Sequence, residues 1–233
     1  GTILNDGSSH DIAVSNFDTH GFVQWQNVVD HEAASNTASD MAKFGNNLYV
    51  IGTENPSGGT VIIKYDSIGS LEWMDTIHQS NFSRVAVQSN GNPVFAGGGI
   101  YGFSEPDFRL AIYNSVTGTS IFQNSPAQVP DSYSDVSVLK VDQNDNIYAF
   151  GFSSFFGVSP SYKKLQLQKF NSTGALQWTK QLSGIDSTDF AYSVAKNIFI
   201  DNNLNVYVVA NGTALSTNSS KTIIVKYDPN GNQ

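Results

Sequence analysis

The chain of 233 residues has a formal net charge of −8, a pI near 4.7, no cysteine and only 14% charged residues. The acidic balance disfavours a nucleic-acid-binding domain, because phosphates require clustered Lys and Arg. The lack of cysteine excludes disulfides, thiolate nucleophiles and Cys-ligated zinc. Asn, Ser and Thr take the place of charged residues, which disfavours a helix-rich fold. No apolar run approaches the roughly 18 residues of a membrane-spanning helix.

Alternating apolar and polar residues predict short β-strands in a repeating order. In each unit a strand such as VIIKY leads into a turn that ends in glycine, and then into a strand such as SLEW. The aromatic residues of the SLEW-like strands are Trp25, Trp73, Phe122 and Trp178. The turn glycines recur at intervals of 48 to 57 residues, as Gly21, Gly69, Gly118, Gly174 and Gly231. We predict positive φ at these glycines, with Gly118 in a wider loop, and tryptophans packed against the following unit.

A second motif recurs in phase with the first. Its copies are Asn47–Gly52, Pro93–Gly98, Asn146–Gly151 and Asn205–Ala210, and another apolar segment precedes each copy. Each unit therefore holds four short strands, and a period near 50 is typical of a propeller blade. Helical solenoids are excluded because the apolar period is two, and a β-sandwich would not explain the repeat.

The segments KYDSIGSLEW, KFNSTGALQW and IDNNLNVYVV resemble the SBBP family of bacterial β-propeller repeats. They are similar, more distantly, to the tryptophan-docking repeats of quinoprotein propellers. The resemblance covers nearly the whole chain, although the 101–124 unit departs from it. It implies a propeller fold, often in an extracellular bacterial setting, and no single activity.

We therefore predict an all-β chain, a β-propeller built of four-stranded antiparallel blades, with about four to five blades in this segment of a larger propeller. A partial blade covers 1–29, complete blades cover about 30–78, 79–124 and 125–182, and an incomplete blade covers 183–233. Counting gives seventeen strands, and we expect flanking sequence to supply the missing ones. The alternative is a closed five-blade ring in which residues 1–9 form an irregular strand and 11–28 pair with 222–227.

Candidate binding residues fall into two groups. The first strand of each blade should be innermost, which places Asp40, Arg84, Asp135 and Ser193 near one mouth of a channel, either as a polar site or as a solvated ring. The loops between second and third strands vary in length, and variable loops on a rigid scaffold favour recognition. Their candidates for contact with a sugar or a protein are Tyr101, Phe103, Glu105, Asp107, Phe155, Phe156 and Tyr162; alternatively these rings fill gaps beneath the loops.

Two Asx-rich segments have the oxygen spacing of a calcium loop. They are Asp142, Asn144 and Asn146, and Asp201, Asn203 and Asn205. Neither has the glycine and distal Glu of an EF-hand, so hairpin Asx turns are the favoured interpretation. No cofactor, metal cluster or Ser-His-Asp arrangement is predicted.

The leading hypothesis is a non-enzymatic, extracellular scaffold or binding module of a larger secreted or cell-surface protein. Its partners would be a protein or a carbohydrate and the rest of its own longer chain. The alternative is a propeller enzyme, a glycoside hydrolase or lyase with acids in the channel. A quinone-dependent dehydrogenase is a weaker option, since the sequence offers no ligand set for the cofactor.

Overall fold

The computed structural model describes residues 1–233 except 6–8, 30–34, 56–57, 79, 99–107, 125–131, 156–161, 183–189 and 215–218. At 3–5, 9, 132, 155, 162–163, 190–193 and 213–214 only the backbone pairing is described. The described part of the chain contains no helix with the length and apolarity that a membrane crossing requires.

Eighteen strands are described, and the strands of each sheet follow one another along the chain. The first sheet holds β1 (Thr2–Asn5), β2 (Ser9–Phe17) and β3 (Val23–Val29); the second β4 (Ser35–Phe44), β5 (Asn47–Asn55), β6 (Gly59–Tyr65) and β7 (Leu71–Ile77); the third β8 (Asn81–Val87), β9 (Pro93–Gly98), β10 (Arg109–Tyr113) and β11 (Ser120–Gln123); the fourth β12 (Ser132–Val141), β13 (Ile147–Phe155), β14 (Tyr162–Phe170) and β15 (Leu176–Gln181); the fifth β16 (Phe190–Ile200), β17 (Val206–Ala214) and β18 (Ser219–Tyr227).

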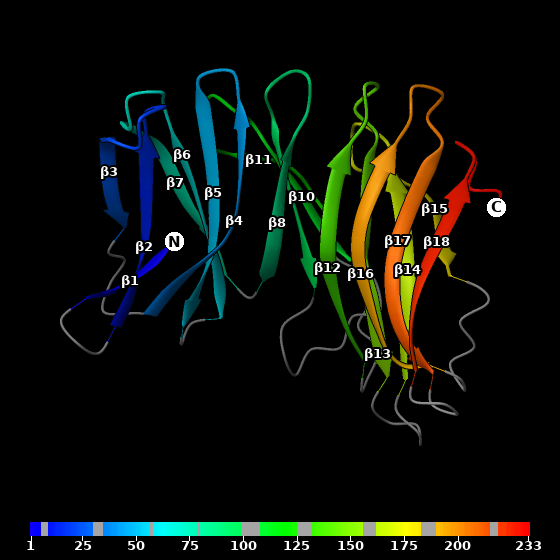
Figure 1. Ribbon diagram of the computed structural model, residues 1–233. Helices are drawn as coiled ribbons and strands as arrows, with labels where there is room; N and C mark the ends of the chain where they lie inside the picture. Colours follow the sequence, from blue (N-terminus) through cyan, green and yellow to red (C-terminus); the bar gives the residue numbers. More distant parts are fainter. Residues whose placement is uncertain are drawn as a thin grey trace.

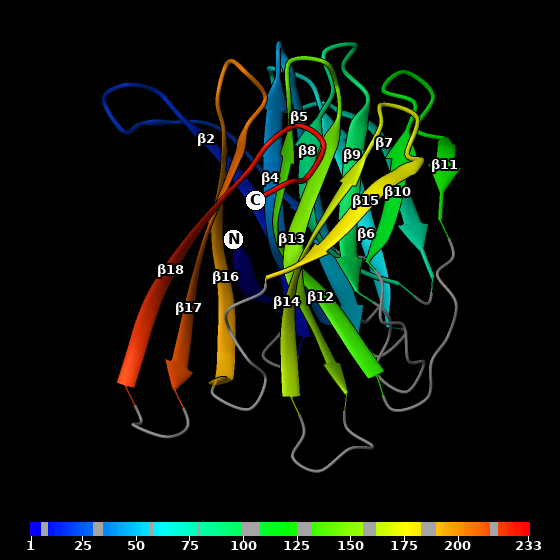
Figure 2. The same cartoon turned by 90° about the vertical axis from the view of Figure 1, so that its right-hand side faces the viewer.

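All neighbouring strands within a sheet are antiparallel, so the chain is all-β with several four-stranded antiparallel sheets. The five sheets stand in chain order from one end of the molecule to the other (Figure 1). Seen along this row, β2 and β18 lie to one side and β11 lies to the other (Figure 2). The row is therefore curved, with the third sheet at its bend.

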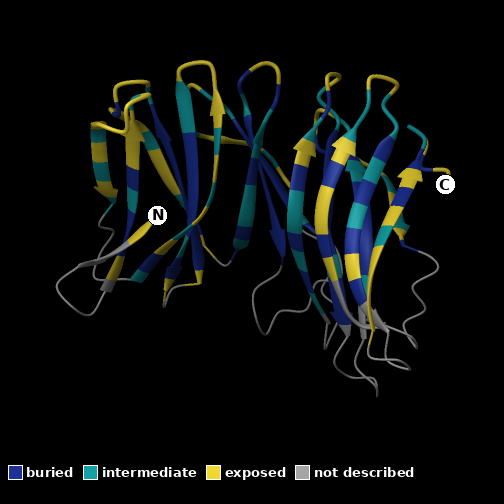
Figure 3. Ribbon diagram, in the orientation of Figure 1, coloured by how far each residue is buried: buried dark blue, intermediate teal, exposed yellow. Residues whose placement is uncertain are grey.

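Each hydrophobic core lies between two successive sheets rather than inside one sheet. Ile12 and Val61 share the first core, Tyr49 and Phe95 the second, Val94 and Ile147 the third, and Tyr148 and Val208 the fourth. Buried residues consequently run along the second strands, β5, β9, β13 and β17 (Figure 3). Both faces of an inner sheet are apolar because each packs against a neighbour.

The two ends of the chain differ in part from expectation. Thr2–Asn5 forms an additional strand, β1, which pairs with β2, so the sequence count missed one strand. Among the described residues, β18 pairs with β17 and no ladder joins 11–28 to 222–227. The supply of further strands from flanking sequence stays a prediction.

The alignment of the second motif was wrong by one residue in the third sheet. Gly97, and not Gly98, pairs with the first strand beside its bulge, as Gly52 and Gly151 do. A Cβ on Gly97 would overlap the carbonyl oxygen of Asn81, just as one on Gly151 would overlap that of Asp135. Val94 consequently takes the place that the alignment assigned to Phe95, and Phe95 faces the second sheet.

In the first sheet, β2 and β3 correspond to the third and fourth strands of the later sheets. The turns between third and fourth strands have the predicted geometry. Gly21, Gly69, Gly118, Gly174 and Gly231 have φ between 67° and 89°. Gly69 donates to the Asp66 carbonyl three residues earlier, whereas Gly118 donates to the Asn114 carbonyl four residues earlier, which is the expected wider loop. The side chain that opens each turn accepts backbone N–H groups, as Asp66 does from Ile68 and Ser70.

Leu204 adopts a left-handed conformation, with φ of 62°, in the turn between β16 and β17. The corresponding residue of the third sheet is Gly91, which has φ of 87°. Because a side chain is strained there, we expect Leu204→Gly to raise the free energy of unfolding by about 1 kcal/mol. Urea denaturation measures the change. Asn203→Gly is the control and should destabilise the chain; a loss of stability with Leu204→Gly would contradict the assignment.

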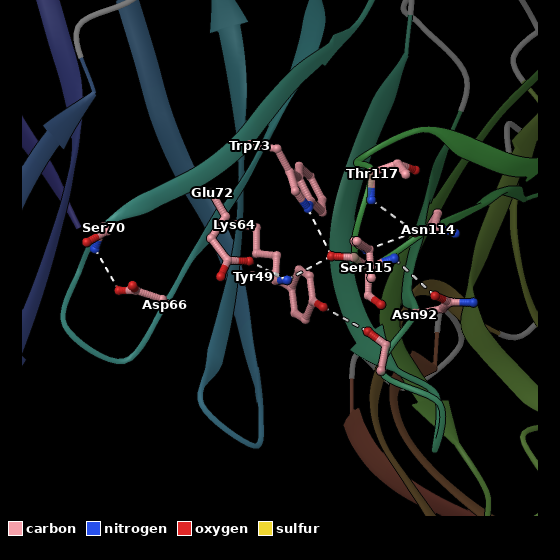
Figure 4. Close-up of polar contacts among 12 residues, drawn as sticks. Tyr49, Lys64, Asp66, Ser70, Glu72, Trp73, Asn92, Asn114, Ser115 and Thr117 are labelled. Carbon is pink, nitrogen blue, oxygen red and sulfur yellow. Dashed lines mark hydrogen bonds and ion pairs between the residues drawn. The ribbon is translucent and has the colours of Figure 1, made fainter.

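Each aromatic residue of a fourth strand packs on the turn glycine of the next sheet, as predicted. A Cβ on Gly69 would lie 2.6 Å from the Trp25 ring, and one on Gly118 would lie 2.8 Å from the Trp73 ring. Phe122 meets Gly174 and Trp178 meets Gly231 in the same way. Each indole also donates its Nε1–H to a turn carbonyl, of Ser67 (3.2 Å), Ser115 (3.1 Å) and Pro229 (3.3 Å). Figure 4 shows Trp73 directed at Ser115.

Lysines of the third strands reinforce two of these junctions. Lys64 Nζ donates to the Ser115 carbonyl that also receives Trp73, and it pairs with Glu72 (Figure 4). Lys169 Nζ donates to the Pro229 carbonyl together with Trp178. Where Phe122 replaces Trp, the Gln88 side chain donates to the corresponding Ser172 carbonyl at 2.7 Å. The turn carbonyl therefore receives a side-chain donor even at the degenerate copy.

Tyr49 makes the stability of the second junction sensitive to alkali. Burial, with a further contribution from Glu72, raises the pKa of Tyr49 to about 12. The neutral phenol is favoured in the folded state, so its contribution is complete below the unfolded pKa of about 10 and is lost as the pH rises toward 12. We expect thermal unfolding to be insensitive to this group at pH 8–9 and to shift to lower temperature above pH 10. Tyr49→Phe should flatten the alkaline slope, and an unchanged slope would contradict the prediction.

Candidate functional site

A cleft of about 540 Å³ lies over the first strands of the second to fifth sheets. Its lining comes from β4, β8, β12 and β16 and carries four charged side chains, Asp40, Arg84, Lys140 and Lys196. Ser137 and Asn197 add neutral polar groups. The structure thus brings two of the four predicted first-strand residues, Asp40 and Arg84, into one cleft.

The polar lining is positioned by a β-bulge in each first strand. The register shifts between Ala38 and Asp40, between Phe82 and Arg84, between Val136 and Val138, and between Ala195 and Asn197. A bulge places two residues opposite one and redirects the side chains beside it. Asp40, Arg84, Val138 and Asn197 therefore occupy equivalent positions in the four strands.

Asp40 and Arg84 are both held by the neighbouring strand. The two carboxylate oxygens of Asp40 accept the backbone N–H groups of Met41 at 2.9 Å and Val85 at 3.0 Å. Arg84 donates from Nε to the Ser137 carbonyl at 2.6 Å and from Nη1 to the Ser83 carbonyl at 2.7 Å. These bonds fix the guanidinium across β8 and β12 before any ligand arrives.

Asp135 does not belong with Asp40, contrary to the sequence alignment. It pairs with Phe152 and lies before the bulge, whereas the residue equivalent to Asp40 is Val138, which follows the bulge and pairs with Phe150. Asp135 accepts a hydrogen bond from the Ser83 hydroxyl at 3.2 Å, so it contacts β8 from the side opposite to Asp40. The pair flanks one strand and does not face across the cleft.

The charge of the cleft favours an anionic ligand. Three cationic side chains and a single carboxylate line it, although the chain as a whole carries a net charge of −8. Glycoside hydrolysis uses two carboxylates roughly 5–10 Å apart, and Asp40 is the one acidic residue of the described lining. Sequence analysis missed Lys140 and Lys196, although both lie in first strands of successive units.

Most of the other predicted residues lie in parts of the chain that the structure does not describe. Tyr101, Phe103, Glu105, Asp107 and Phe156 lie outside the described residues, and so do most of the loops that carry them. Phe155 and Tyr162 form the last backbone pair of β13 and β14, next to the undescribed 156–161 segment. Ser193 pairs with Gly212. That ligands prefer the loops between second and third strands, at 99–108 and 152–163, stays a prediction.

The two calcium candidates form Asx turns. Asp142 accepts the backbone N–H groups of Asn144 and Asn146, the Asn146 side chain and the Tyr148 hydroxyl. Asp201 repeats the arrangement with Asn203, Asn205 and Tyr207. The hydrogen bond from the Asn205 side chain is the main cause that holds the pKa of Asp201 below its usual value. Each carboxylate therefore closes its own hairpin.

No protein family matches the sequence, and no curated protein sequence matches it. Among solved structures, the chain is similar to the crystal structure of endo-arabinase from Bacteroides thetaiotaomicron VPI-5482, with a TM-score of 0.42 and 12% sequence identity. The match covers 83% of this chain and 76% of the endo-arabinase chain.

Proposed function

We propose that the chain is a segment of a β-propeller that acts as a non-enzymatic binding module of a larger secreted or cell-surface protein. Its ligand is a carbohydrate that bears carboxylate groups, held in the cleft over β4, β8, β12 and β16. The repeated sheets and the curved row support the propeller, and the Asn-, Ser- and Thr-rich composition supports the extracellular setting.

The fixed guanidinium of Arg84 is the observation that carries this proposal. Arginine is suited to carboxylates because its planar donors match their geometry, and Arg84 is already oriented by two carbonyl bonds. Lys140 and Lys196 are exposed and line the same cleft, so they can reach an anion there. The Asp40 carboxylate is engaged by backbone N–H groups, and the described lining of the cleft holds no second acid to pair with it.

Calorimetric titration with oligogalacturonides and with neutral arabino-oligosaccharides tests the ligand class. We expect binding of the acidic oligosaccharide, weakened by salt and reduced about tenfold or more by Lys140→Glu with Lys196→Glu, since charge reversal removes attraction and adds repulsion. Lys43→Glu is the matched control, because Lys43 is exposed on β4 outside the cleft lining. Equal binding of the neutral oligosaccharide would contradict the proposal.

The enzyme alternative is tested on the same protein. A glycoside hydrolase or lyase with channel acids would release reducing ends or unsaturated products from a polysaccharide, and Asp40→Asn or Asp135→Asn would abolish release while the protein remains folded. We expect no such turnover from the unmodified chain. Turnover that either substitution removes would replace the binding module by the enzyme.

A further inference from the structure

The first sheet repeats the turn that receives an aromatic ring in the later sheets, and none of the residues that the structure describes covers this turn. Asp18 accepts the N–H groups of His20 and Phe22, and Gly21 has φ of 85°, as in the turns of the later sheets. A Cβ on Gly21 would have no atom of a described residue within 4 Å, whereas one at Gly69, Gly118, Gly174 or Gly231 would meet an aromatic ring. The difference lies in what covers the turn and not in its backbone.

The aromatic residue that ends the strand before the turn shows the same contrast. Phe17 is 57% exposed, while its equivalents Tyr65, Tyr113, Phe170 and Tyr227 are each 3% exposed or less. Trp25, Trp73 and Trp178 lie 6.0–6.5 Å from Tyr65, Tyr113 and Tyr227, measured between ring centroids. An indole is thus the group that covers this position in three of the four junctions.

The chain has no tryptophan left for this position. Its three tryptophans all dock on later turns, at Gly69, Gly118 and Gly231. The carbonyl that would receive the indole N–H is that of Thr19, which corresponds to Ser67, Ser115 and Pro229. A second copy of the chain could offer its tryptophans only by giving up these junctions.

We propose that Phe17, the Thr19 carbonyl and Gly21 form a docking site for a tryptophan carried by the outer strand of a sheet of the same repeat type, which residues 1–233 do not contain. The indole lies on Gly21 and against the Phe17 ring, and its Nε1–H donates to Thr19. The partner is thereby identified by its chemistry, as a β-sheet unit with a Leu-x-Trp strand.

The probe is a synthetic peptide of Leu165–Leu182, which carries Trp178 and its hairpin, titrated into the isotope-labelled chain and followed by amide NMR shifts. We expect saturable shifts confined to residues 17–22 and their neighbours, and no shifts with the same peptide carrying Trp178→Ala. Gly21→Val in the chain should abolish binding, and Phe17→Ser should weaken it about tenfold, since it removes the ring contact.

Three results would overturn the docking site. These are an absence of shifts at 17–22 with the tryptophan peptide, equal shifts with the alanine peptide, and shifts centred on the turns of later sheets. Sedimentation velocity of the chain alone adds a fourth, because self-association that Gly21→Val removes would make a second copy the occupant. Carbohydrate titration of the same variants should be unaffected, which separates this site from the proposed cleft.

Discussion

Replacing Trp73 with Ala is expected to lower the free energy of unfolding by about 3–4 kcal/mol, in the range for large aromatic residues removed from a core. The indole contacts Gly118, lies between Tyr49 and Tyr113, and donates to the Ser115 carbonyl. Loss of the indole opens a cavity at the junction of the second and third sheets. It also leaves the Ser115 carbonyl with Lys64 as its one remaining side-chain donor among the described residues. Urea denaturation followed by circular dichroism measures the change.

Leu71→Ala is the matched control, because Leu71 lies on the same strand and is 55% exposed. We expect it to change stability by less than about 1 kcal/mol, as is usual for surface sites. Trp73→Phe should recover part of the loss, since Phe122 performs the same packing one junction later. A Trp73→Ala variant as stable as Leu71→Ala would show that the junction contributes little.

Replacing Gly69 with Val is expected to cost about 3 kcal/mol, through two effects of similar size. A β-branched residue is strained at φ of 83°, and its Cβ would lie 2.6 Å from the Trp25 ring. Gly21→Val carries the same backbone strain, at φ of 85°, with no ring of the described part of the chain beside it. It should therefore cost only about 1–2 kcal/mol.

The difference between the two valine variants isolates the contact with the indole. Thermal unfolding of both proteins, with the double variant Gly69→Val and Trp25→Ala, completes the comparison. We expect the second substitution to cost less in the presence of the first than alone, because the two residues share one contact. Equal losses of stability for Gly21→Val and Gly69→Val would mean that backbone strain alone accounts for the requirement for glycine at position 69.

Much of the local structure could be predicted from individual residues of the sequence. Asp66 and Gly69 predict a tight turn, and Trp73 after the turn predicts a large ring that packs against a neighbouring sheet. The register of β9 could not be predicted, because Pro93–Gly98 contains two successive glycines and only the pairing with β8 shows which of them lies beside the bulge. β1 carries no repeat motif, so nothing in the sequence predicted that it pairs with β2.

The candidate site was less accessible to sequence reasoning. Asp40 and Arg84 do lie on first strands, but Asp135 was matched to them by its place near the start of its strand, whereas the residue that follows the bulge in β12, as Asp40 does in β4, is Val138. Lys140 and Lys196 could not be recognised as site residues from the sequence, because they line one cleft only once four strands from distant parts of the chain have come together. The paired donors Lys64 and Trp73 likewise converge on Ser115 only after two sheets have packed.

The direction in which the tryptophans reach has a consequence during protein synthesis. Each ring docks on a turn that lies later in the chain, 44 residues later for Trp25 and Gly69 and 53 residues later for Trp178 and Gly231. A nascent sheet therefore leaves the ribosome with its aromatic ring exposed and covers it only when the next turn emerges. Folding on the ribosome should trail translation by one sheet, so that one uncovered aromatic ring, an indole in three of the four cases, is the group a chaperone would find.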